Sequence, residues 1–105
     1  MKKEHKVLIT AKIDSTFRNT TKNRIAKQCL EHANEWTILY KDMDARAKWK
    51  RSYLENYNSC HQYIIDNFDK SQVKTFSILA IILPTIISYI AKWVTQWVLD
   101  NLLDD

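Results

Sequence analysis

Apolar residues recur at helical spacing through the middle of the chain, from residue 24 to residue 68, a region without Gly or Pro. The steps alternate between four and three residues, which is typical of a helix that packs against other helices. Small and aromatic side chains dominate this stripe rather than Leu and Ile, so we expect packing against partner chains and not a regular two-stranded coiled coil. The predicted partner-packing seam comprises Cys29, Ala33, Trp36, Tyr40, Met43, Ala47, Leu54, Tyr57, Ile64 and Phe68.

Two helical geometries fit this region, which the pattern places at about residues 22–68. The first is a single helix of about 45 residues, roughly 65 Å long, whose seam a partner chain would have to cover. The second is a helical hairpin that turns near residues 42–45, where an Asp caps the second helix and the two helices partly cover each other. The pattern leaves both geometries open.

The first 23 residues divide into an apolar and a polar part. Val7–Ile13 fits either a short strand or the first turns of a helix, and the pattern does not separate them. Residues 14–23 are polar and rich in capping residues, which predicts a connector with Thr20 or Thr21 as the N-cap of the next helix.

A second break is predicted at residues 67–71, where Asp69 or Ser71 can cap the helix that follows. The chain therefore divides into three parts. Residues 1–23 form an N-terminal strand or helix with a polar connector, 24–70 an amphipathic helical region, and 71–105 a C-terminal membrane-anchor helix with an amphipathic end.

The most apolar part of the chain, residues 76–91, carries no charge. On an insertion scale its Phe, Ile and Leu side chains favour a bilayer by about 3–5 kcal/mol, and Lys92 costs little if its ammonium reaches the interface. Pro84 would cost a helix in water about 3 kcal/mol but is common in transmembrane helices. We therefore predict an all-α chain that ends in a transmembrane helix at about residues 72–103.

The predicted membrane segment ends in aromatic residues spaced four apart, as in an interfacial belt. Its members are Phe76, Ile78, Leu79, Ile81, Ile82, Leu83, Pro84, Ile86, Ile87, Tyr89, Ile90, Trp93 and Trp97. The alternative is a buried helix at the centre of a soluble bundle or oligomer, since a helix that is apolar all round belongs in a core or a membrane.

Charge and composition add an orientation and exclude several sites. The net charge is +4, yet residues 76–105 hold only Lys92 against Asp100, Asp104 and Asp105. A spanning helix would therefore keep the N-terminal region on the cytoplasmic or equivalent inner side. The chain has no Gly, which excludes a Gly-rich phosphate loop and a nucleophile elbow, and we expect neither an enzyme nor a cofactor.

Two further groups of residues are weak candidates for a binding site. A basic patch of Arg46, Lys48, Lys50 and Arg51 surrounds Trp49 and fits either anionic lipid or a solvated helix face, and nucleic acid is not an expected partner. In a hairpin, Cys29 with His32 and Cys60 with His61 would come level, as zinc ligands or as a disulfide. Neighbouring Cys and His on a helix point in different directions, so we expect no metal.

Together these patterns favour a small tail-anchored, single-pass membrane protein. Its partners would be membrane lipid and protein chains, or further copies of itself, and its role structural or scaffolding. One alternative is a holin-like or toxin-like effector that oligomerises and permeabilises a bilayer. A second is a soluble helical oligomer that binds nucleic acid or protein.

Overall fold

Four α-helices and one short 3-10 helix, with no β-strand, make up the described part of the chain. The structure is a computed structural model that describes residues 2–40, 53–73 and 77–101, with side chains except at 38–40, 53–56, 72 and 77–81. The elements are α1 (Lys3–Thr16), α2 (Thr20–Tyr40), α4 (Tyr53–Asp66), η1 (Lys70–Gln72) and α5 (Ser77–Asn101). The predicted all-α fold is thereby confirmed.

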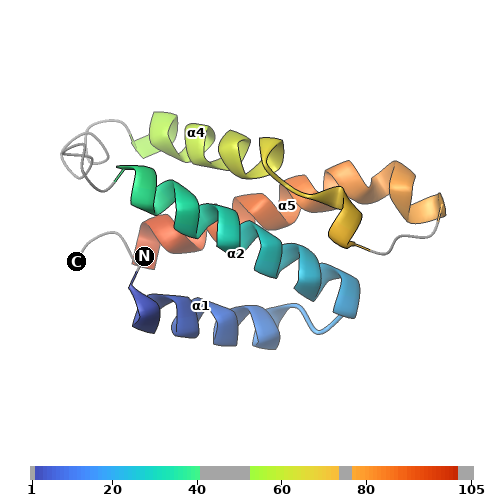
Figure 1. Cartoon of the computed structure of the whole chain (residues 1–105), viewed down its shortest axis with the longest axis horizontal. Coiled ribbons are helices and arrows are strands. Elements are labelled where there is room, and N and C mark those ends of the chain that lie inside the picture. Colours follow the sequence, from blue (N-terminus) through green and yellow to red (C-terminus); the bar gives the residue numbers. More distant parts are fainter. Residues whose placement is uncertain (1, 41–52, 74–76, 102–105) are drawn as a thin grey trace.

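Successive helices run in alternate directions, so α1 begins and α5 ends at the same end of the bundle (Figure 1). The central helix is α2, which packs against each of the other three helices, while α5 packs against α2 and α4. Since α1 packs mainly against α2, it forms one side of the bundle and takes a smaller part in the core.

The N-terminal region is a helix and not a strand. Ile9, Ile13 and Phe17 are spaced four apart and are all buried, which places one face of α1 on the core. The predicted connector is shorter than residues 14–23, because α1 continues to Thr16. The predicted cap is wrong by one residue: the side-chain oxygen of Asn19 accepts hydrogen bonds from the backbone N–H groups of residues 21 and 22.

The middle region contains two helices, α2 and α4, which run in opposite directions (Figure 1). Of the two geometries, the hairpin is therefore correct and the single long helix is wrong. The predicted turn at residues 42–45 lies outside the described residues. At the second predicted break, Asp69 caps η1 by accepting a hydrogen bond from the backbone N–H of Ser71 at 2.9 Å.

Two clusters of buried side chains hold the helices together. The larger draws on every helix and on Val73 after η1, and the smaller joins Trp36, Cys60 and Leu99. The larger cluster consists of Ile9, Ile13, Phe17, Ile25, Ala26, Cys29, Leu30, Ala33, Ile64, Phe68, Val73, Leu83, Ile87, Ile90, Ala91, Val94 and Val98. The members from α5 alone span four turns, so that helix contributes one long apolar face to the interior.

The transmembrane helix predicted at residues 72–103 is not supported. Within the residues that the structure describes, no helix is long and apolar enough to cross a membrane. In α5, Pro84, Thr85 and Ser88 lie among the isoleucines, and Lys92 and Gln96 follow. Its most apolar face is also buried against other helices of the same chain.

Candidate interaction surface

Helix α5 carries apolar side chains on more than one face, and among those that the structure describes some are buried and some are exposed. Leu83, Ile87 and Ile90 lie in the core with the valines of the following turns. On a neighbouring face, Ile82 is 45% exposed and Tyr89 is 65% exposed, with the partly buried Ile86 between them. We call these three residues the α5 edge, because the spacing 82, 86, 89 places them on one side of a helix.

The α5 edge lies in the first half of α5. Figure 1 shows α5 extending past the α1–α2 turn at the end of the molecule where α5 begins. Pro84 and Thr85 are exposed there as well, so this first half of α5 meets solvent on several sides. A helix that is apolar nearly all round but covered on one side retains apolar surface for another contact.

Beyond Tyr89, the same side of α5 is covered. Trp93 stands one turn further along, and its ring meets the ring of Phe17 edge to face, with centroids 5.0 Å apart and planes at 80°. Trp93 and Trp97 are partly buried and pack against the larger cluster. The end of α1 therefore marks the boundary between the open and the covered part of this side of α5.

Two aromatic side chains of α4 fix α5 from the other side. The Tyr57 hydroxyl donates to the carbonyl oxygen of Lys92 at 3.5 Å, and Nε2 of His61 donates to that of Ser88 at 3.1 Å. The two rings stack, with centroids 6.4 Å apart. Burial raises the pKa of Tyr57, and Asp100 adds to the shift. The sequence gives no sign of these bonds, because their acceptors are backbone atoms of a distant helix.

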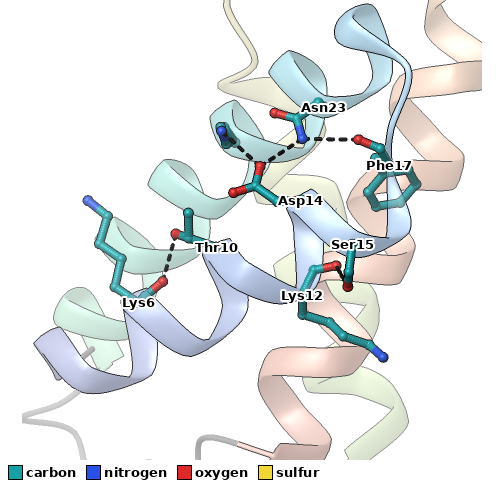
Figure 2. Close-up of polar contacts among 8 residues, drawn as sticks. Lys6, Thr10, Lys12, Asp14, Ser15, Phe17 and Asn23 are labelled. Carbon is teal, nitrogen blue, oxygen red and sulfur yellow. Dashed lines mark hydrogen bonds and ion pairs between the residues drawn. The ribbon is translucent and has the colours of Figure 1, made fainter.

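Polar contacts at the surface join α1 to α2. Figure 2 shows the Asn23 amide nitrogen between two acceptors, Asp14 Oδ1 and the carbonyl oxygen of Phe17, each at 3.0 Å. Lys27 Nζ also lies 3.1 Å from Asp14 Oδ1, and a second ion pair joins Lys6 and Glu31 at 2.7 Å. The hydrogen bonds from Asn23 and Lys27 lower the pKa of the Asp14 carboxyl. These contacts fix how α1 lies on α2.

The described side chains of the predicted seam pack within the chain itself. Cys29, Ala33, Ile64 and Phe68 lie in the larger cluster, and Trp36 lies in the smaller one with Tyr57 packed against it. The remaining members, Tyr40, Met43, Ala47 and Leu54, fall outside the described side chains. The hairpin thus supplies a cover that the sequence interpretation assigned to partner chains.

The predicted membrane segment separates into a buried and an outer set. Leu83, Ile87 and Ile90 are buried, Ile86, Trp93 and Trp97 are partly buried, and Ile82, Pro84 and Tyr89 are exposed. Phe76, Ile78, Leu79 and Ile81 lie outside the described side chains, as does the whole basic patch of Arg46, Lys48, Lys50 and Arg51. The sequence named the residues of the α5 edge but could not say which side the bundle would cover.

The cysteines and histidines do not form a metal site in the described part of the chain, where no three His, Cys, Asp or Glu side chains are grouped as ligands. Cys29 and Cys60 are both free and buried. Burial raises the pKa of the Cys29 thiol from 9.0 to about 12 and also raises the pKa of Cys60. Both thiols are therefore protonated side chains of the core at neutral pH, where the thiolate is the reactive form.

Neither a protein-family model, a curated protein nor a solved structure matches this chain.

Proposed function

We propose that this chain is a small membrane-associated protein without a catalytic role, which binds a bilayer surface through the α5 edge and holds protein partners there. The observation that carries the proposal is the exposure of Ile82 and Tyr89 on a helix whose neighbouring face is already buried. Large apolar side chains on one side of a helix bind at the boundary between headgroups and acyl chains. Tyrosine suits that depth because its ring is apolar and its hydroxyl stays hydrated.

Charge supports an anionic lipid surface over a basic or neutral partner. No acidic residue occurs between Asp69 and Asp100, whereas Lys70 and Lys92 are both exposed. Arg18 is exposed too, and it follows Phe17 in the turn from α1 to α2. Basic side chains beside an apolar helix face are attracted to anionic headgroups, by about 1 kcal/mol for each Lys or Arg near the surface.

Flotation of the full-length chain with lipid vesicles tests the proposal. Vesicles of phosphatidylcholine and phosphatidylserine at three to one should carry the protein to the top of a gradient, and pure phosphatidylcholine should carry less. The double variant Ile82→Ser/Tyr89→Ser should remain at the bottom. The matched control is Val7→Ser/Leu8→Ser, which removes two exposed apolar side chains from α1 and should float like the original chain.

The same preparation separates the neighbouring hypotheses. Resistance to alkaline carbonate would favour the tail-anchored form, in which α5 crosses the bilayer with the N-terminal region on the cytoplasmic side. Release of a trapped dye would favour a membrane-permeabilising effector. If neither the original chain nor the α1 variant floats with the vesicles, the lipid proposal is contradicted. If the α5 variant changes its oligomeric state in the absence of lipid, the result instead indicates self-association.

A further inference from the structure

Helix α1 covers the continuation of the α5 edge. The residues 82, 86, 89, 93 and 97 follow one another at steps of four and three, so they form one stripe on α5. Ile86, Trp93 and Trp97 pack against the larger cluster, whereas Ile82 and Tyr89 are exposed. Phe17 contacts Trp93 directly, and in antiparallel helices that register places Ile13, one turn earlier, level with Trp97.

The hold of α1 on the bundle is limited. Within the described chain it buries two of its own side chains, Ile9 and Ile13, together with Phe17 at its C-terminal cap. The two ion pairs that join α1 to α2 are solvent-exposed, since the side chains of Lys6, Glu31, Lys27 and Asp14 are 40–58% exposed. Ion pairs of this kind are weak and are screened by salt.

Helix α1 also depends on tertiary packing for its stability. No side chain caps its N-terminus at Lys2, and no basic residue stands in its last turn, so the favourable charge at its ends is that of Glu4 in the first turn. A helix of 14 residues is marginal without tertiary packing. Segments with few buried contacts open locally, at lower free energy than global unfolding.

We propose that α1 is a displaceable cover over the second half of this stripe, and that its departure exposes Trp93 and Trp97 and doubles the length of the bilayer-binding surface. This inference rests on the proposed function, because it concerns the regulation of the same site. Tryptophan is the side chain most favoured at the membrane interface together with tyrosine, so an open α1 converts a short apolar edge into a stripe of more than three turns. The α1-open form therefore binds lipid more tightly than the closed bundle.

A pair of double variants tests the cover without leaving a hole in the core. Lys6→Ala/Asp14→Ala removes the two ion pairs and one bond from Asn23. Glu4→Ala/Lys12→Ala, on the exposed side of the same helix, removes the same charges without touching α2. Hydrogen exchange of the free proteins should show faster exchange in α1 than in α2 and α5, and the first variant should raise α1 exchange by about fivefold over the control.

Flotation supplies the second measurement. The first variant should bind three-to-one phosphatidylcholine–phosphatidylserine vesicles about fivefold more tightly than the control, and bound protein should lose exchange protection in α1 while α2 and α4 keep theirs. Equal exchange rates in α1, α2 and α5 would overturn the inference, as would equal binding by the two variants. If α1 exchanges faster than α2 and α5 but no form of the chain binds vesicles, the lipid proposal is contradicted while the local opening of α1 is supported.

Discussion

Nε2 of His61 on α4 lies 3.1 Å from the carbonyl oxygen of Ser88 on α5. Because a carbonyl oxygen only accepts, this ring nitrogen must carry the proton. The bond joins two helices through a half-buried contact, next to a second bond from Tyr57 to the carbonyl of Lys92. The α4–α5 interface thus depends on donors whose loss leaves the helices themselves intact.

Replacing His61 with Phe should measure this bond. The ring remains to stack on Tyr57, but the donor to Ser88 is lost, so we expect a loss of about 0.5–1.5 kcal/mol in the free energy of unfolding. Urea denaturation provides the measurement. The exposed Asn58 on the same helix supplies the control, Asn58→Ala, and equal stability of the two variants would show that the bond contributes nothing.

The two sides of α5 should respond differently to the same truncation. Ile90 is fully buried and Ile82 is 45% exposed, so Ile90→Ala should cost about 2–5 kcal/mol through lost burial and a cavity. Ile82→Ala should change stability by no more than about 0.5 kcal/mol. Thermal or urea unfolding in the absence of lipid checks both, and similar losses at the two positions would mean that α5 does not pack as described.

Asn19 should be the cap on which α2 depends. Its side chain accepts from two backbone N–H groups at 3.0 and 3.2 Å, and Asn19→Ala should cost about 1 kcal/mol. Thr20→Ala, at the next residue, removes a hydroxyl from a position where no cap is expected. Circular dichroism during urea unfolding compares the two, and a larger loss from the Thr20 variant would restore the cap predicted from the sequence.

Stability should fall in acid partly through Asp14. Hydrogen bonds from Asn23 and Lys27 lower its pKa in the folded state below the ordinary value of 3.8. The charged form therefore stabilises the fold above pH 3.8, and that contribution is lost as the pH falls through the folded-state pKa. The stability difference between the original chain and Asp14→Asn should shrink below pH 3.8 in a series of urea unfolding curves. A difference that is constant with pH would contradict the linkage.

Periodicity predicted the helices well because it depends on which residues face a common side. Cys29 and Ile64 were assigned to one apolar stripe, and both are buried in one cluster. The stripe could not reveal which chain covers it, since an apolar face is the same whether a neighbouring helix or a partner protein packs on it. The hairpin supplied that cover, and the sequence had left the hairpin as one of two choices.

The transmembrane assignment of α5 is unsupported for a related reason. Isoleucines such as Ile87 and Ile90 suit a bilayer and a bundle core equally well, so composition alone could not separate the two. The helix that contains Val7–Ile13 has a recognisable pattern that extends beyond that segment, because Ile9, Ile13 and Phe17 are spaced four apart. The hydrogen bonds from Asn23 and His61 to backbone carbonyls left no such pattern, because every residue has the same carbonyl group and the sequence does not show which one a side chain contacts.

The alternating directions of the helices have a practical consequence for imaging this protein. Since α1 begins and α5 ends at one end of the bundle while α5 begins at the other (Figure 1), a label in the first turn of α1 or the last turn of α5 would stand away from the start of α5. Donor and acceptor dyes attached at Lys3 and Asn101 would lie at the same end of the closed bundle. The energy transfer between the two dyes would fall when α1 leaves the bundle, so it would report the opening of α1.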